Sequence, residues 1–287
     1  MSIERIFVAG AGLMGHGIGQ VFATIGVGVT LYEPDLARAE AGRDRIAGNL
    51  DRAVAKGKLD QAVRDAIVGR VAVTADLDEA QEADLILEAV FEDVAVKQAL
   101  WHELDDRTNP DAIFASNTSS ISIDQLASAV SPARRGQFVG MHFFSPVPVM
   151  PLVELIRGAA TTDATETTIR EVTDALGKKL IVSADRPGFI VNRILMPLLA
   201  EAMHTLEEGT GTADDIDTGA KVGLNHPMGP LELADFIGLD VCLNVMKVLH
   251  EGIGGEHFRP PKVLEDLVAA GHLGQKTGRG FHTYPRV

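Results

Sequence analysis

The chain has 287 residues, of which 46% are hydrophobic and 23% charged, and its formal net charge is −14. This length favours two packed domains, and the composition is that of a globular protein rather than a disordered or fibrous one. The negative charge disfavours binding to nucleic acid or to a membrane surface, and no apolar stretch approaches the ~20 residues needed to span a bilayer.

The chain enters the apolar run Ile6-Phe7-Val8-Ala9 almost at once. This start leaves no room for a signal or transit peptide, so we expect a cytoplasmic protein. The single cysteine, Cys242, cannot form an internal disulfide and lies in an apolar segment. We expect it to be a buried structural thiol rather than a nucleophile.

Short apolar or β-branched runs alternate with helical segments through residue 185. The predicted strands are residues 6–9, 27–31, 71–74, 85–87, 112–115 and 138–141. Strands separated by helices require crossover connections and therefore predict a mostly parallel sheet. The segment between Glu33 and Val71 is too long for one helix, and it predicts a projecting helical pair broken at Gly57.

The character of the sequence changes after the turn at residues 185–188. Apolar residues then recur at spacings of three and four, starting near Pro187 and continuing through Glu208, and no later segment alternates as a strand. Helices are expected to stop at Gly209, at 227–230 and at 260–261. The sequence therefore predicts an α/β domain over residues 1–185 and an all-helical domain over residues 186–287.

A glycine-rich loop follows the first predicted strand and opens a helix that ends near Gly26. Its sequence is Gly10-Ala11-Gly12-Leu13-Met14-Gly15. Glycines at these spacings permit a tight turn, the approach of backbone to a pyrophosphate and close helix-to-strand packing. Three glycines at these spacings can also arise by chance in a plain turn. The interpretation as a dinucleotide-binding loop therefore depends on the strand before them and the helix after them. We predict a Rossmann-type, doubly wound dinucleotide-binding domain.

Glu33 ends the second predicted strand, 23 residues after Gly10. An acidic side chain at this place accepts hydrogen bonds from the adenosine ribose hydroxyls. A 2′-phosphate ~4 Å from it would suffer roughly 4 kcal/mol of repulsion at an effective dielectric of 20, so we predict NAD rather than NADP. Arg38 could turn inward and weaken this preference, and Glu33 could also be only a solvated loop acid.

His142 ends another predicted strand, at the sheet edge where α/β proteins gather ligands. Glu154 lies twelve residues later in the apolar run 152–156. A buried carboxylate needs a partner, and His142 is the obvious candidate. Such a pair suits alcohol oxidation, because the imidazole can take the hydroxyl proton while the carboxylate orients the ring. The alternative is a purely structural ion pair.

Polar residues 116–120, Ser116-Asn117-Thr118-Ser119-Ser120, follow the strand at 112–115. They are either turn formers or groups that contact a nicotinamide and a substrate oxygen. Asn192 shares a helical face with apolar residues and could offer its amide to a substrate oxygen. His16 and His226 are more typical of surface or turn positions, and no spacing predicts a metal site.

Seven motifs in this order resemble the 3-hydroxyacyl-CoA dehydrogenase family, in particular its single-function 3-hydroxybutyryl-CoA dehydrogenases. They are residues 10–15, 116–120, 142–144, 146–148, 187–193, 227–230 and 276–278. The resemblance implies a Rossmann-type domain, a helical domain that forms a homodimer, and His142 and Glu154 as the catalytic pair. It also implies that Ser119 and Asn192 polarise the substrate.

The resemblance further implies ligand contacts. Those to NAD would come from the glycine loop, Glu33, Ala89, Glu92, Lys97, Asn117, Ser119, Ser145 and Lys276. CoA would be held by Asn49 and Lys56, with Arg52 on the same helical face and Ser119 at the reacting end. Ser145 and Pro151 stand where members often carry Asn and Lys, which leaves the local nicotinamide and CoA contacts open.

The predicted function is the NAD-dependent oxidation of a short-chain (S)-3-hydroxyacyl-CoA to the 3-ketoacyl-CoA, and the reverse reduction. One alternative is a dehydrogenase of the same fold that acts on a free hydroxy acid, such as a sugar acid or carnitine. Another is a protein that binds NAD without turnover.

Overall fold

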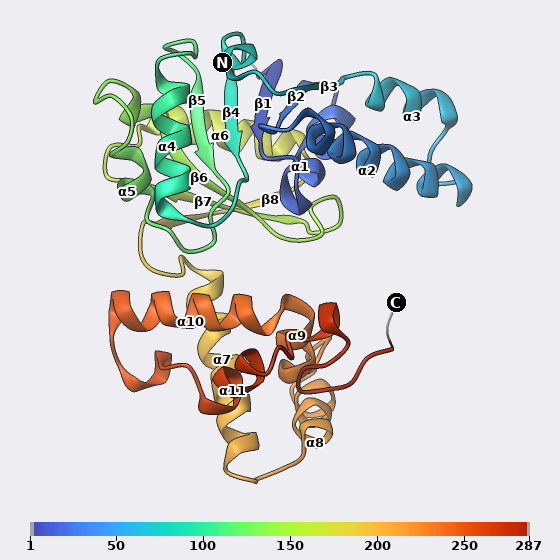
Figure 1. Cartoon of the computed structure of the whole chain (residues 1–287), viewed down its shortest axis with the longest axis vertical. Helices are drawn as coiled ribbons and strands as arrows, with labels where there is room; N and C mark the ends of the chain where they lie inside the picture. Colours follow the sequence, from blue (N-terminus) through green and yellow to red (C-terminus); the bar gives the residue numbers. More distant parts are fainter. Residues whose placement is uncertain (1–2, 286–287) are drawn as a thin grey trace. The chain divides into compact units, whose positions relative to one another are not determined.

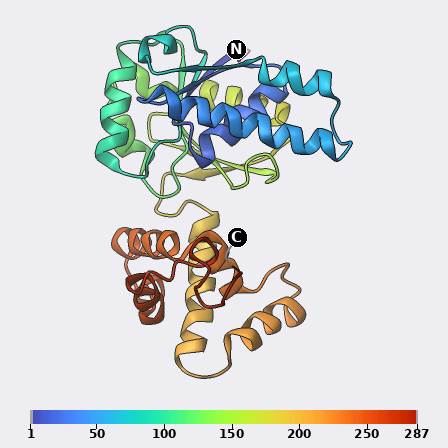
Figure 2. The ribbon, with the colours of Figure 1, turned by 45° about the vertical axis from the view of Figure 1, so that its right-hand side comes forward.

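The structure is a computed structural model that describes residues 3–285, and the chain divides into two compact units, Met1–Arg186 and Pro187–Val287. Figures 1 and 2 show the first unit as a sheet flanked by helices and the second as a group of helices. Each unit is described by itself below.

A single sheet runs through the first unit. Within residues 3–285 its strands are β1 (Arg5–Ala9), β2 (Gly28–Tyr32), β3 (Val71–Thr74), β4 (Leu85–Glu88), β5 (Ile113–Ser116), β6 (Phe138–Phe143), β7 (Leu152–Arg157) and β8 (Lys179–Ala184). Their order across the sheet is β3-β2-β1-β4-β5-β6-β7-β8. All neighbouring pairs are parallel except β6 and β7, which are antiparallel. The predicted mostly parallel, doubly wound fold is confirmed.

Strands β7 and β8 were not among the six runs predicted as strands. The eight residues between β6 and β7 are too few for a crossover helix, so the chain can only turn back and pair antiparallel. Periodicity along β7 and β8 does not reveal this, because short apolar runs are compatible with strand and with buried helix alike. The two strands extend the sheet beyond β6.

Helices cover both faces of the sheet. They are α1 (Leu13–Thr24), α2 (Leu36–Ala55), α3 (Gln61–Val68), α4 (Val94–Asp105), α5 (Ile123–Ala127) and α6 (Asp163–Ala175). Alternation along β5 shows the two faces: Ala115 belongs to the core cluster that includes Phe22 of α1, while Phe114 stacks on Trp101 of α4 with ring centroids 4.9 Å apart. The predicted helical pair is confirmed as α2 and α3, with Gly57 in a left-handed turn between them (Figure 1).

The second unit contains α7 (Val191–Glu207), α8 (Ala213–Thr218), α9 (Pro230–Ile237), α10 (Leu239–Ile253) and α11 (Lys262–Ala269). Its core gathers apolar side chains from these helices, including Leu199, Leu231 and Leu249. Helix α7 begins at Val191 rather than near Pro187, because Gly188 and Phe189 have positive φ angles and form a turn. Cys242 is fully buried in this core, and burial raises the pKa of its thiol to about 12.

Within residues 3–285, no helix combines the length and the apolar character required to cross a membrane.

Candidate active site

The glycine loop lies at the carboxyl end of β1. Gly10 has φ of +102°, and a Cβ there would come within 2.6 Å of the Ala89 carbonyl oxygen, so only glycine fits. A Cβ at Gly15 would lie 1.7 Å from the Gly10 carbonyl oxygen, which allows α1 to start directly against the strand. A Cβ at Gly12 would meet nothing within 4 Å. The loop is therefore closed toward the sheet and open at Gly12, as the approach of a pyrophosphate to the helix N-terminus requires.

Glu33 lies beside this loop at the end of β2 and is 9% exposed. Its Oε1 accepts a hydrogen bond of 2.8 Å from the backbone N–H of Ala11, and its Oε2 lies 3.8 Å from Nε of the exposed Arg38. These side chains line a pocket together with Gly12, Leu13, His16, Ala41 and Arg45. The pocket presents a carboxylate next to a helix N-terminus, which fits an adenosine ribose followed by a pyrophosphate.

His142 and Glu154 face each other across the antiparallel strands β6 and β7, where they are register partners. Nδ1 of His142 lies 2.8 Å from Oε2 of Glu154, and the two residues are 5% and 0% exposed. Because a carboxylate oxygen accepts, Nδ1 carries the hydrogen of this bond. The strand pairing thus fixes the orientation of the ring.

The other ring nitrogen faces the edge of the sheet. Nε2 of His142 lies 3.1 Å from Oγ of Ser119, which follows β5. Oδ1 of Asn117 accepts a 2.9 Å hydrogen bond from the backbone N–H of Phe143, so it links the end of β5 to the end of β6. The structure therefore brings together His142, Glu154, Ser119 and Asn117, all singled out from the sequence.

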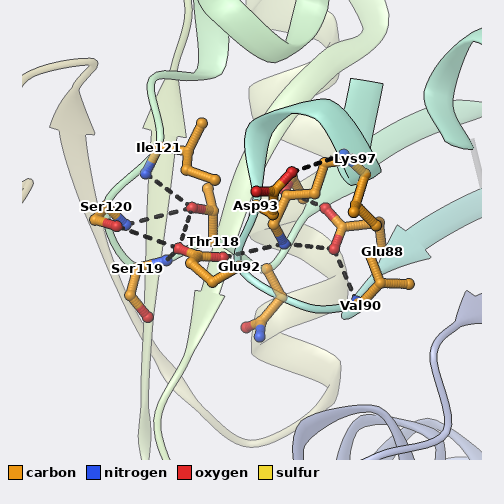
Figure 3. A network of polar contacts seen from close by, with 12 residues as sticks. Glu88, Val90, Glu92, Asp93, Lys97, Thr118, Ser119, Ser120 and Ile121 are labelled. Atoms are coloured by element: carbon orange, nitrogen blue, oxygen red, sulfur yellow. Dashed lines mark hydrogen bonds and ion pairs between the residues drawn. The ribbon is translucent and has the colours of Figure 1, made fainter. Parts of the chain in front are cut away.

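Two residues predicted to contact NAD, Glu92 and Lys97, belong to a network that also contains a residue the sequence analysis missed (Figure 3). The side chain of Lys97 is 0% exposed, and its Nζ lies 2.5 Å from Glu88 and 3.1 Å from Glu92. Glu92 is 37% exposed and Ala89 half-buried. The local sequence gave a signal for Glu88, because a carboxylate that ends an all-apolar strand needs a buried partner.

The residues predicted to hold CoA lie on one stretch of α2. The amide of Asn49 donates 3.0 Å to Oε1 of Gln20 on α1, and Arg52 hydrogen-bonds the oxygen of the same amide. Asn49 and Arg52 line a pocket between these helices together with His16, Ala41, Asp44, Arg45 and Gly48. Lys56 is exposed at the end of α2. Their contact with CoA stays a prediction.

The remaining predicted residues are placed as follows. Ser145 is exposed in the loop between β6 and β7. In the second unit, Asn192 is the second residue of α7 and is 9% exposed, and Nζ of Lys276 lies 2.5 Å from Oδ1 of Asp240. Their contacts with ligands stay predictions.

The ends of β1, β4, β5 and β6 meet at one edge of the sheet because these strands are parallel. The edge carries the glycine loop, a hydroxyl and an imidazole backed by a carboxylate. An imidazole oriented in this way can accept a proton from an alcohol while the carboxylate stabilises the resulting imidazolium. The arrangement is that of a dehydrogenase with a dinucleotide cofactor.

Comparison with known proteins agrees with this geometry. Residues 5–186 match the model of the NAD binding domain of 3-hydroxyacyl-CoA dehydrogenase, and residues 188–284 match that of its C-terminal domain. The chain is 48% identical over 282 residues to a 3-hydroxybutyryl-CoA dehydrogenase of Bradyrhizobium diazoefficiens, which covers 98% of this chain and 96% of that protein. It is 38% identical over 294 residues to the human mitochondrial hydroxyacyl-coenzyme A dehydrogenase, with 98% and 91% covered.

A solved structure gives the same result. The crystal structure of (S)-3-hydroxybutyryl-CoA dehydrogenase from Ralstonia eutropha superposes with a TM-score of 0.95 at 42% identity, covering 99% of this chain and 100% of that one. Similarity in sequence, in fold and in both domain models therefore extends over nearly the whole chain, and the chain belongs to the 3-hydroxyacyl-CoA dehydrogenase family.

Proposed function

We propose that this protein interconverts (S)-3-hydroxybutyryl-CoA and acetoacetyl-CoA with NAD, and that His142 and Glu154 are its proton-transfer pair. The observation that carries the proposal is the hydrogen-bonded series Glu154, His142 and Ser119, which ends at the edge of the sheet that also carries the glycine loop. The relatives named 3-hydroxybutyryl-CoA dehydrogenase support the substrate.

In the oxidation, Nε2 of His142 takes the proton of the 3-hydroxyl group as the hydride leaves carbon 3. NAD, held by the glycine loop and Glu33, would supply the hydride acceptor. Glu154 stabilises the imidazolium that forms, and it keeps Nδ1 protonated so that Nε2 is the basic nitrogen. Ser119 positions the substrate oxygen against the ring, and Asn192 is proposed to polarise the substrate. Reduction follows the reverse path.

The thioester end of the substrate is bound, in this proposal, along α2. Asn49, Arg52 and Lys56 provide donors and positive charge on α2, outside its buried face, which suits the phosphates of CoA. These contacts explain why an acyl-CoA, rather than a free hydroxy acid, is the expected substrate.

The experiment that tests the function is NADH-dependent reduction of a series of 3-ketoacyl-CoA thioesters and of free acetoacetate. We expect the four-carbon thioester to be reduced far faster than free acetoacetate. Equal rates on the thioester and the free acid would contradict the CoA assignment, and the absence of turnover on every compound would contradict the catalytic one.

Cofactor choice is proposed to depend on Glu33. Replacement Glu33→Ser removes a repulsion of roughly 4 kcal/mol toward a 2′-phosphate and leaves Arg38 able to bind it. We expect the ratio of kcat/KM for NADPH over NADH to rise by about 100-fold or more. The matched control is Glu40→Ser, an exposed acid on α2, the helix that carries Arg38. An unchanged ratio in Glu33→Ser would show that other residues select the cofactor.

We also propose that the second unit, predicted to begin at residue 186, forms a homodimer in the cytoplasm. Large apolar side chains of this unit are exposed, among them Ile194 at 67%, Phe236 at 50% and Val241 at 42%. A group of exposed apolar side chains is typical of a protein–protein interface. Light scattering should give the mass of a dimer for the wild type and of a monomer for Ile194→Glu.

A further inference from the structure

Three ionisable side chains form a compact group next to the loop that carries Ser119 (Figure 3). Glu88 is the last residue of β4, Glu92 lies in the loop that follows, and Lys97 lies on α4. The side chains of Glu88 and Lys97 are both 0% exposed. The contacts that the three residues make with one another indicate their function.

Glu88 accepts three hydrogen bonds. They come from Nζ of Lys97 at 2.5 Å, from Oγ of Ser116 at 2.6 Å and from the backbone N–H of Val90 at 2.8 Å. Burial raises the pKa of Glu88, and Lys97 and the other donors oppose this effect only in part. All three groups that contact the carboxylate are donors, and one of them is an ammonium group. Glu88 therefore fixes the position of the Lys97 ammonium group in the interior.

The same ammonium group reaches Glu92. Nζ of Lys97 lies 3.1 Å from Oε2 of Glu92, which leaves Oε1 for the loop after β5. That oxygen accepts from Oγ of Thr118 at 2.6 Å, from the backbone N–H of Ser119 at 2.8 Å and from Oγ of Ser120 at 3.3 Å. Burial raises the pKa of Glu92, but Lys97, Thr118 and Ser119 together hold it below its usual range. Glu92 is thus the anchor of the loop that carries Ser119.

Ser119 completes the connection, since its Oγ lies 3.1 Å from Nε2 of His142. We propose that Glu88 is a positioning residue: it holds the ammonium group of Lys97 in place, Lys97 orients Glu92, and Glu92 places Ser119 against His142. The proposal rests on the proposed roles of His142 and Ser119.

The main test is Glu88→Gln in the full-length chain, assayed by reduction of acetoacetyl-CoA with NADH between pH 5 and 8. In this direction His142 donates the proton to the substrate. A fall in the rate at acid pH therefore reports the protonation of another group, which we expect to be Glu92. We expect kcat to fall by about 10- to 100-fold, because a misplacement of about 1 Å in a catalytic group costs up to about 10²-fold. KM for acetoacetyl-CoA should change little.

The pH profile distinguishes positioning from a general loss of structure. Glu92 must be ionised to hold the loop, so activity is present above its pKa and is lost as the pH falls through it. Lys97 lowers the pKa of Glu92. Its displacement from Glu92 raises that pKa, and we expect the acid limb of kcat in Glu88→Gln to move up by about one pH unit or more. An acid limb at the wild-type position with wild-type kcat would overturn the proposal.

Two further variants keep the result interpretable. Asp105→Asn removes a comparable ion pair of the same unit, Asp105 with Arg134 at 3.1 Å, and should lower the melting temperature without moving the acid limb.

The double variant Glu88→Gln with Lys97→Met removes both buried charges and leaves no unpaired ion. It should fold even if Glu88→Gln does not, and it should still show the displaced acid limb; a wild-type profile here would also overturn the proposal.

The proposed function fails by a different result. If His142→Gln keeps wild-type turnover, the catalytic assignment is wrong whatever Glu88→Gln does. If His142→Gln is inactive while Glu88→Gln and the double variant behave as wild type, only the positioning role of Glu88 is wrong.

Discussion

The two units each contain a contact between a histidine and a buried carboxylate, and the two contacts differ in what surrounds them. In the first unit, Nδ1 of His142 meets Glu154 at 2.8 Å, and Nε2 meets the hydroxyl of Ser119. In the second, Nε2 of His282 meets Asp217 at 2.7 Å, and Nδ1 lies 3.4 Å from Asp214. The nitrogen–oxygen distances alone therefore do not show whether the two pairs have the same role.

The surroundings of the two carboxylates distinguish the roles of the two pairs. Asp217 also accepts from the backbone N–H groups of Leu231 and Glu232, at 2.8 and 3.0 Å, so it caps the start of α9. Both nitrogens of His282 face carboxylates, and neither is left for an alcohol. Glu154 lies within a strand and His142 presents one nitrogen to a sheet edge. A histidine–carboxylate pair is therefore a candidate for catalysis when its second ring nitrogen faces a hydroxyl at a ligand-binding sheet edge, and structural when the second ring nitrogen faces another carboxylate.

The largest expected effect separates the two histidines. His142→Gln should lower turnover by about 10²-fold or more, because it removes the general acid and base, with NAD affinity nearly unchanged. The matched variant His282→Gln should keep turnover within a few-fold of wild type. Steady-state kinetics measures the turnover, and a fluorescence titration with NADH measures the affinity for the cofactor. Equal losses of turnover in the two variants would contradict the different roles assigned to His142 and His282.

The second expected effect concerns Glu154, the carboxylate that contacts the proposed catalytic ring. Glu154→Gln keeps the shape of the side chain but removes the charge that stabilises the imidazolium, and we expect turnover to fall by about tenfold or more. The melting temperature should change less than the turnover does. A variant that loses stability but retains full turnover would show that Glu154 is structural, like Asp217.

The third expected effect lies in the stability of the second unit. Asp217→Asn breaks a buried pair and weakens two hydrogen bonds to the start of α9, so we expect it to lower the free energy of unfolding by about 3 kcal/mol. Urea unfolding monitored by circular dichroism measures this loss. Turnover of the folded variant at low temperature should stay within a few-fold of wild type.

The smallest expected effect is a pH dependence of stability at Asp235, whose carboxylate holds the end of the chain through Phe281, His282 and Tyr284. Burial raises the pKa of Asp235 above its ordinary value. The folded state then binds the proton more tightly than the unfolded state, so the contribution of Asp235 to stability declines as the pH rises from about 4 through the raised value. The stability deficit of Asp235→Asn should therefore narrow with rising pH, whereas parallel curves would contradict the sign.

Much of the site could be predicted from local sequence. The glycines of the loop, the strands on either side of it and the polar residues after β5 are adjacent in the chain, so their spacing reports their arrangement directly. His142 and Glu154 could be paired because a carboxylate amid aliphatic residues needs a partner, and the nearest histidine lies in the preceding strand. For Ser119, the sequence predicted only that it lies at the same sheet edge as His142, and it did not predict that the two side chains are in contact.

Sequence alone determined the class of fold, the dinucleotide loop and the identity of the imidazole, because each follows from periodicity or spacing within a few residues. Tertiary structure decided the antiparallel turn into β7, the internal pairing of Lys97 with Glu88 and Glu92, and the occupation of both nitrogens of His282. These depend on which distant segments pack together, and a buried charge reveals that it has a partner without revealing which one.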